Sequence, residues 1–359
     1  MKTLRMVVVC LSLATGTGVA AAQCPGANPN DGSPDSAALQ ACLDAPGVTQ
    51  VYLDRGNPGY IIDVKLRFRS DDKVLASSGP DKAILIAGSS LDGPMLETQD
   101  AYGYTMFELI FDGRKSARSI GSRCDVPGSN RGSNLVLSGD NWVVHHIDTV
   151  NALCGSAMAV TGGNYQVYSV YASDNGSEDS GRWADGITLN RCDGGYVHHN
   201  TANENTDVGI VVGRGYGCVV RFNTVQNFSR HAFAGIHVGG EADSHAGSEV
   251  KDNTISSGYD RLAFGLMVGS HPWGFVVSDV GTVSYNSISG AVVNLAVDGV
   301  GTGTVSGNTV WGAQGSYGYS CSLSANYTIG DYGGASLQGG WDYTWHYNGP
   351  IGGGGCGAI

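Results

Sequence analysis

The chain has 359 residues, of which 56 are glycine and only 14% are charged, a composition that favours a turn-rich β protein over a helical one. Its formal net charge of −12 argues against a nucleic-acid partner, because such a partner needs a basic surface. The same charge disfavours tight binding of a densely anionic polymer, although a local basic groove can still hold one.

Residues 1–22 have the pattern of an export signal. Lys2 and Arg5 precede an apolar run at residues 6–14, and the alanines at 20–22 supply small side chains for cleavage. The apolar run is much shorter than the ~20 residues that a membrane span needs. We therefore predict a secreted or periplasmic protein with a signal peptide over residues 1–22 and no membrane span.

Cysteine usage agrees with export. Removal of Cys10 with the signal leaves eight cysteines, an even number that suggests disulfide bonds. Adjacent turns of a coiled sheet would bring sequence neighbours together, so we expect nearest-neighbour pairing, although the spacing alone leaves the connectivity open. The expected pairs are Cys24–Cys42, Cys124–Cys154, Cys192–Cys218 and Cys321–Cys356.

Two short phrases recur through the centre of the chain. Copies of a Val-x-x-Asn-Thr/Ser phrase, spaced by 23, 30, 33 and 22 residues, begin at Val197, Val220, Val250, Val283 and Val305. Copies of a Gly-Ile/Leu-x-Leu/Val phrase begin at Gly186, Gly209, Gly235 and Gly265, with looser versions at Ala157 and Asn294. Each repeat therefore has two short alternating strands separated by glycine-rich turns.

A repeat of this size cannot bury its own apolar face, but stacked copies can. We therefore predict an all-β fold, a right-handed parallel β-helix whose successive coils pair ~4.8 Å apart. The aliphatic residues would stack inward. The asparagines would form a column whose amides hydrogen-bond along the stack.

These phrases resemble the repeats of the pectate-lyase-like superfamily of right-handed parallel β-helix proteins, over about residues 30–312. Upstream, Asp35–Leu43 is similar to the helix that caps the first coil in that superfamily, and Val51–Asp54 and Phe111–Gly113 are similar to its early-coil phrases. The resemblance implies the fold but no single activity, because the superfamily includes lyases, hydrolases, epimerases and non-enzymes. Asn205-Thr206-Asp207 matches only the first motif of its polygalacturonase-type hydrolases, so no catalytic residue is carried over.

The C-terminal segment breaks the repeat pattern. It is rich in Gly, Tyr and Trp, and we interpret it as a cap over the last coil, because an open end would be an exposed strand edge. An aromatic sugar-binding tail is the alternative. The chain would thus consist of an N-terminal cap with the first coils (23–120), the β-helix repeats (121–312) and this segment (313–359).

Strand alternation places a set of ionisable side chains on one outer flank. If Ile187, Leu189 and their counterparts point inward, the alternate residues point outward. One outward column would be the glycines of the second phrase, which either lets a ligand approach the backbone or suits a tight corner. The functional side chains expected on this flank are Arg182, Trp183, Asp185, Asp207, His231, His237, Glu241 and Arg261.

A lyase could use this set. It would neutralise a uronate carboxylate with Arg182 and Arg261, and His231 or His237 would remove the adjacent proton. An epimerase would use the same groups and return the proton.

A glycoside hydrolase could use it too, through two carboxylates. These lie ~5–5.5 Å apart in retaining enzymes and ~6.5–9.5 Å apart in inverting ones. Asp185 and Asp207 fit this role, with Glu241 as a third candidate.

The leading hypothesis is a carbohydrate-active enzyme, a lyase or hydrolase that cleaves or modifies an extended polysaccharide. Its predicted catalytic residues are Asp207, His231, Asp185 and His237, and its predicted substrate-binding residues are Arg182, Arg261, Glu241 and Trp183. No cofactor is expected, although clustered Asp and Glu leave a Ca²⁺ site open. The alternative is a non-catalytic carbohydrate-binding or surface adhesion protein, which should present aromatic side chains for sugar stacking.

Overall fold

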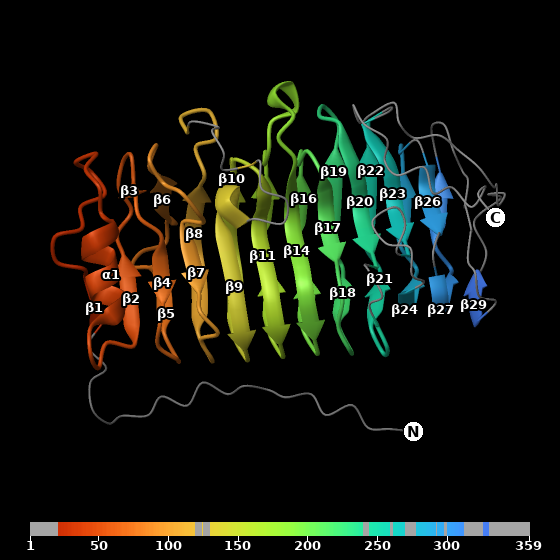
Figure 1. The fold of residues 1–359 in the computed structure, drawn as a ribbon, viewed down its shortest axis with the longest axis horizontal. Coiled ribbons are helices and arrows are strands. Elements are labelled where there is room, and N and C mark those ends of the chain that lie inside the picture. The colour runs from red at the N-terminus through yellow and green to blue at the C-terminus, as the bar shows by residue number, and fades with distance from the viewer. Residues whose placement is uncertain are drawn as a thin grey trace.

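The computed structural model describes residues 21–118, 124, 130–239, 244–258, 261–269, 278–291, 293–297, 300–311 and 326–329. Within these ranges the chain winds into successive coils, and each strand runs parallel to its counterparts in the neighbouring coils (Figure 1). The predicted all-β parallel β-helix is confirmed. Outside the described residues lie the first 20 residues of the predicted signal peptide, Glu241, the Cys321–Cys356 pair and most of the C-terminal segment.

A twenty-stranded sheet forms two faces of the solenoid. β8 (Thr105–Asp112) and β10 (Val143–Val150) run through both faces, because their first and second halves pair with different strands. The first face also contains β1 (Ala21–Ala22), β2 (Gln50–Leu53), β5 (Val74–Ser77), β12 (Gln166–Tyr168), β15 (Tyr196–His198), β18 (Val219–Arg221), β21 (Glu249–Lys251), β24 (Ser278–Ser284), β27 (Val300–Ser306) and β29 (Asn326–Ile329). The second face also contains β3 (Tyr60–Ile62), β6 (Ala83–Ala87), β13 (Tyr171–Ser173), β16 (Thr201–Asn203), β19 (Thr224–Asn227), β22 (Thr254–Ser257), β25 (Ser287–Ser289) and β28 (Thr309–Trp311).

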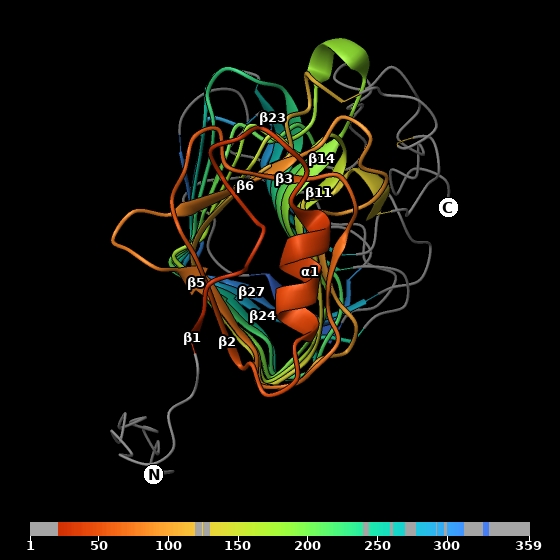
Figure 2. The ribbon, with the colours of Figure 1, turned by 90° about the vertical axis from the view of Figure 1, so that its left-hand side faces the viewer.

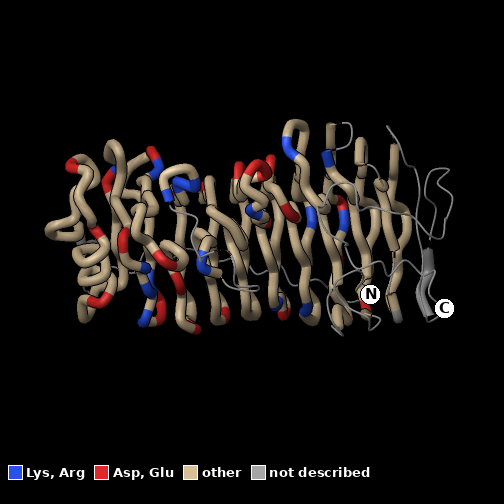
Figure 3. Tube along the Cα trace, turned by 45° about the horizontal axis from the view of Figure 1, so that its top comes forward, with Lys and Arg blue, Asp and Glu red and all other residues tan. Residues whose placement is uncertain are grey.

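The third face is a nine-stranded parallel sheet. Its strands are β4 (Leu66–Phe68), β7 (Leu96–Thr98), β9 (Leu135–Asp140), β11 (Gly155–Gly163), β14 (Ala184–Asp193), β17 (Val208–Val212), β20 (Ala232–Val238), β23 (Leu262–Val268) and β26 (Val293–Val297). Short helices outside the sheets are α1 (Ser36–Asp44), η2 (Asn130–Gly132) and η3 (Glu178–Ser180). Lys, Arg, Asp and Glu gather mostly at the edges where the coils turn, whereas the strand centres carry few of them (Figure 3).

Aliphatic side chains repeat at the same depth from coil to coil. In the nine-stranded sheet Ile187 pairs with Ile210, Ile210 with Ile236, and Ile236 with Leu266. All four side chains are fully buried in one continuous core. The inward stacking predicted from the alternation is confirmed, and each such side chain contributes about 1.5–3 kcal/mol through its burial.

The predicted asparagine column is continuous. The side-chain amide of Asn200 donates to Oδ1 of Asn223 at 2.9 Å. The same bond joins Asn223 to Asn253 at 3.0 Å, Asn253 to Asn286 at 2.9 Å and Asn286 to Asn308 at 2.8 Å. Each accepting Oδ1 also takes the backbone N–H of the preceding asparagine. The buried amides are therefore paired along the whole stack, which stabilises the turn they occupy.

A residue with left-handed backbone stands just before each of the first four of these asparagines. The φ angle is +54° at His199 and +57° at Phe222, for example. Earlier coils and later coils have the same conformation at Glu108, His146, Ser169, Asp252 and Tyr285. These residues turn the chain from the first face to the second, and the stacked neighbours hold non-glycine residues in a conformation they rarely adopt.

The N-terminal end of the solenoid is covered as the resemblance implies. α1 lies across this end (Figure 2), and Leu39 and Leu43 on its inner side join the core. Three predicted disulfides are confirmed, namely Cys24–Cys42, Cys124–Cys154 and Cys192–Cys218. Across the part of the chain that the structure describes, no helix combines the length and the apolar character that crossing a membrane requires.

The glycine column of the second phrase does not face outward. A Cβ atom at Gly209 would lie 2.4 Å from Cγ1 of Val225, and one at Gly235 would lie 2.5 Å from Cγ2 of Ile255. Val225 and Ile255 belong to the core. The outward placement was therefore wrong: β19, β22 and their counterparts pack directly against the backbone here, which leaves no room for a side chain.

We expect Gly235→Ala to lower the free energy of unfolding by about 1–3 kcal/mol, because the added methyl group must displace a packed core side chain or backbone. Urea unfolding followed by circular dichroism measures the change. Gly79→Ala is the matched control, since a Cβ there meets nothing within 4 Å. Equal stability of the two variants would show that core side chains do not pack tightly against these glycines.

Candidate active site

A pocket of about 280 Å³ opens on the outer side of the nine-stranded sheet. It spans β14, β17 and β20, and its lining residues are Asp185, Asp207, Val208, Val211, Gly213, His237 and Gly239. Three of the four predicted catalytic residues thus lie around one cavity. They come from successive coils and are brought together by the strand register alone.

Hydrogen bonds to neighbouring coils fix Asp185. Its Oδ1 accepts the backbone N–H of Val208 at 3.1 Å, and its Oδ2 accepts the Thr188 hydroxyl at 2.6 Å. The Thr188 hydroxyl also lies 2.7 Å from that of Ser156, which is paired with Asp185 in the register of β11 and β14. The carboxyl group is therefore held by donors on three coils.

Asp207 stands one rung further along. Its backbone N–H donates to the carbonyl of Ala184, and its own carbonyl accepts the N–H groups of Phe233 and Ala234. These ladder bonds set Asp207 against Ala184, one residue before Asp185 on the neighbouring rung, and both aspartates line the pocket. Two carboxyl groups on neighbouring rungs are what a glycoside hydrolase requires.

The two carboxyl groups border an apolar surface. Outside the main core, a second cluster of buried side chains covers the later strands of the same sheet, and it consists of Val208, Phe233, Ala234, Ala263, Phe264, Met267 and Ala296, with Val211 against it. Phe233 packs edge-on against Phe264, with ring centroids 5.2 Å apart. Phe233, which the alternation places on the outer flank, is therefore buried and unavailable as an open sugar platform.

Burial raises the pKa of Asp185 to about 6, and the hydrogen bonds from Thr188, Val208 and Ser156 oppose this rise. The physical cause is the loss of water around a charge that apolar neighbours cannot replace. A carboxyl group with such a pKa keeps its proton in mildly acidic solution. Asp185 can therefore act as a proton donor, as one member of a hydrolase pair must.

His237 is a neutral imidazole. Its Nε2 lies 3.0 Å from the carbonyl oxygen of Gly269, and since a carbonyl only accepts, Nε2 carries the proton. Burial lowers the pKa of His237 to about 4, the bond to Gly269 opposes this, and the nearby His245 adds to it. In this tautomer Nδ1 has no proton, so it can accept a hydrogen bond or a proton.

His231 and Arg261 form a separate cluster. His231 Nδ1 contacts a carboxylate oxygen of Glu178 in η3, and His231 Nε2 lies 2.8 Å from Nη1 of Arg261. Burial alone would raise the pKa of Glu178, but the hydrogen bonds to His231 and the charges of His231 and Arg261 together lower it. Neither His231 nor Arg261 is among the described residues that line the pocket.

The remaining predicted site residues lie beside the pocket or outside the described ranges. Arg182 exchanges backbone hydrogen bonds with Ser177 and closes the loop that carries η3, and its carbonyl accepts the Thr206 hydroxyl. Trp183 follows it, and its carbonyl accepts the N–H of Gly155. Glu241 lies outside the described residues.

Glu178 and Ser156 were not predicted. Ser156 directly precedes the earliest copy of the second phrase, just as Asp185 precedes the copy at Gly186. Aligning the copies of this phrase could therefore have identified Ser156. Glu178 lies in a loop 53 residues before His231, and no periodicity points to it.

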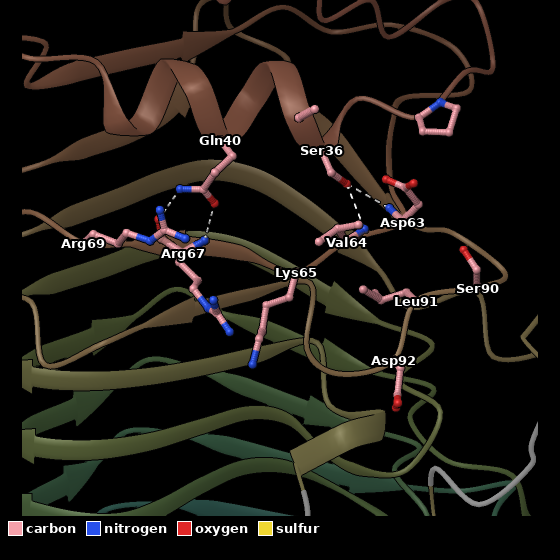
Figure 4. Close-up of a pocket in the computed structure, with 12 residues that line it drawn as sticks. Ser36, Gln40, Asp63, Val64, Lys65, Arg67, Arg69, Ser90, Leu91 and Asp92 are labelled. Atoms are coloured by element: carbon pink, nitrogen blue, oxygen red, sulfur yellow. Dashed lines mark hydrogen bonds between the residues drawn. The ribbon is translucent and has the colours of Figure 1, made fainter.

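A larger cavity of about 690 Å³ lies under α1 at the N-terminal end (Figure 4). Lys65, Arg67 and Arg69 line it, and they alternate with the buried Leu66 and Phe68 along β4. Lys65 pairs with Glu97 and Arg69 with Asp44, while Asp63 and Asp92 also line the cavity. Because the acids offset the cations here, we place the candidate chemistry at Asp185 and Asp207.

Within the described residues, no group of three or more His, Cys, Asp or Glu side chains is placed to hold a metal ion. The Ca²⁺ site considered from the sequence therefore has no cluster of ligands in these ranges.

The sequence matches no protein-family model and no curated protein. Solved structures do match the fold. The A-module of mannuronan C-5 epimerase AlgE4 from Azotobacter vinelandii is 15% identical, with 87% of this chain and 96% of that one covered and a TM-score of 0.54. An exopolygalacturonase from Thermotoga maritima is 11% identical, with 82% and 80% covered and a TM-score of 0.59. The Dettilon tailspike protein is 14% identical, with 86% and 58% covered and a TM-score of 0.59. At these identities the likeness establishes the β-helix fold alone.

Proposed function

We propose that this chain is an exported glycoside hydrolase that cleaves a polysaccharide at the pocket formed by Asp185, Asp207 and His237. The observation that carries the proposal is the pair of carboxyl groups on neighbouring rungs, one of which has a pKa raised to about 6 by burial. Asp185 would protonate the leaving oxygen. Asp207 would act as the nucleophile or activate water.

Hydrolysis is better supported than elimination. A lyase must neutralise a uronate carboxylate, but the described residues that line the pocket include neither Lys nor Arg, and Arg261 is bonded to His231. Elimination is the second candidate because Nδ1 of His237 has no proton and could accept one from a sugar carbon. In that reaction the positive charge that neutralises the uronate carboxylate would have to come from protein residues outside the pocket lining.

A polysaccharide substrate suits an open pocket on the flank of a solenoid, where a long chain can pass. The similar folds include, by their names, a mannuronan C-5 epimerase and an exopolygalacturonase. Three disulfides support an oxidising compartment, and so export. The non-catalytic alternative needs open aromatic side chains for sugar stacking, and Phe233, in the apolar cluster that borders the two carboxyl groups, is buried.

The proposal is tested with a panel of neutral and uronate-containing polysaccharides, on which new reducing ends and unsaturated products are both measured. New reducing ends alone indicate hydrolysis, and both signals together indicate elimination. Asp207→Asn should abolish hydrolysis, whereas Asp179→Asn, in the exposed η3 helix, should leave it unchanged. Full activity of Asp207→Asn would place the chemistry elsewhere, and no product across a broad panel would favour binding without catalysis.

We expect kcat/KM to fall as the pH rises above about 6, by roughly tenfold per unit, because the protonated form of Asp185 is then depleted. A pH–rate profile on the cleaved polymer measures this. The falling limb should be missing from the residual activity of Asp185→Asn, which has no proton to lose. A rate that instead rises through this range would mean that Asp185 acts as a base.

A further inference from the structure

Two histidine pairs stand on the first face of the solenoid, away from the candidate active site. His145-His146 lies within β10, and His198-His199 lies at the end of β15. β12 separates the two strands in the ladder, so the pairs occupy equivalent positions two rungs apart. The proposed hydrolysis uses neither pair.

The two pairs have the same geometry. Nδ1 of His145 lies 2.8 Å from Nδ1 of His146, and Nδ1 of His198 lies 2.8 Å from Nδ1 of His199. The left-handed backbone at the second residue of each pair, with φ of +52° and +54°, brings consecutive side chains to the same side of the chain. Alternating strand backbone would have pointed them apart.

Stacked rings hold the first imidazole of each pair in place. The rings of Phe107, His145, Tyr168 and His198 form a parallel stack, with centroids 4.8–5.1 Å apart. Burial lowers the pKa of His145 and of His198 to about 4, and the adjacent histidine adds to the effect. Both rings are therefore neutral at neutral pH, and His146 and His199 are exposed to solvent.

We propose that each histidine pair binds one divalent transition-metal ion, Cu²⁺ or Ni²⁺ most tightly, through its two Nδ1 atoms. Two metal–nitrogen bonds of ~2.0–2.1 Å that meet at a right angle hold their nitrogens about 2.9 Å apart, close to the spacing present in both pairs. In the free protein one Nδ1 donates a proton to the other. On binding, that proton moves to Nε2 of the same ring, so both Nδ1 atoms face the ion and water fills the remaining positions.

The two sites should differ in strength. Glu108 lies in β8 between the residues paired with His145 and Ile147, which places it one rung from His146. Near the second pair the neighbour is a cation, because Arg221 pairs with His198 in the strand register. A carboxylate favours a bound cation and a guanidinium disfavours it, so the pair at His146 should bind first.

The test uses the full chain without a histidine tag, stripped with EDTA and titrated with CuCl₂ at neutral pH by calorimetry and electron paramagnetic resonance. His146→Asn and His199→Asn each remove one ligand and keep a residue that tolerates left-handed backbone. Each should weaken one site by at least about tenfold, and the double variant should lose both. Ser169→Asn, at the equivalent bend of the intervening coil, is the control and should bind as the parent does.

Nitrogen hyperfine structure from two imidazoles that disappears in the double variant would support the sites directly. If the double variant binds Cu²⁺ as the parent does, the ions are bound elsewhere and the proposal is wrong. If the parent binds no Cu²⁺ at all, the pairs are only hydrogen-bonded, and the proposal is equally wrong. Circular dichroism of the variants checks that the coils are intact.

Discussion

Replacing Asp185 by Asn should lower kcat by about 10²–10⁴-fold, because the general acid is lost. The same change should raise the free energy of unfolding at about pH 8 by about 1–3 kcal/mol. The folded protein binds the Asp185 proton more tightly than the unfolded chain does, since the pKa rises from 3.8 to about 6 on folding. Stability from this group is therefore present below the unfolded pKa and is lost as the pH rises through the folded one.

Asn fits the hydrogen bonds that Asp185 now makes. Its amide oxygen can accept the N–H of Val208, and its NH₂ group can donate to the Thr188 hydroxyl. The Thr188 hydroxyl then donates its own proton to the Ser156 hydroxyl, 2.7 Å away. The stability gain should vanish in acid, where Asp185 is protonated and resembles Asn. Urea unfolding of both proteins across this pH range measures it. A variant that is inactive but no more stable at about pH 8 would mean that the carboxylate is well solvated.

The second large effect is expected in the asparagine column. Asn253→Ala should lower the free energy of unfolding by about 3–5 kcal/mol, because several buried groups lose their partners and each costs about 1–3 kcal/mol. These groups are the backbone N–H and side-chain amide of Asn223, Oδ1 of Asn286 and the carbonyl of Val220. Chemical unfolding gives the number.

Asn203→Ala is the control for this effect. Asn203 also bonds across coils, to Tyr171 and Ser173, but its amide is partly solvated. Its loss should cost less than about 1 kcal/mol, since water can replace the partners. If the two variants unfold alike, the column adds no more than surface hydrogen bonds do.

The features that follow from strand register could be predicted from the sequence. Ile187 and Ile210 align because each follows a glycine in the same phrase, and Asn200 and Asn223 align because each closes a Val-x-x-Asn phrase. The grouping of Asp185 with Asp207 and His237 depends on the same alignment. The repeat of the two phrases determines which residues lie next to each other in neighbouring coils, whatever the side chains are.

Features set by loops or by local changes of direction could not. His231 was expected on the same flank as Asp185 and Asp207, and its partner Glu178 comes from an irregular loop that the repeat does not constrain. Gly209 was expected to face outward because strict strand alternation was assumed at this position. In the structure the core residue Val225 of β19 packs against its backbone. Phe233 lies in β20 but is buried, because a second layer of apolar contacts forms outside the core.

The inter-coil hydrogen bonds have one more consequence for Asp185 and Asp207. Because a solenoid coil contacts only its neighbours, whole coils beyond Met267 could be gained or lost without altering the separation of the two carboxyl groups. The number of coils that contact a polymer can therefore change in evolution without a change in the residues that cleave it. Relatives with longer or shorter stacks could keep one reaction while changing how many sugar units they grip.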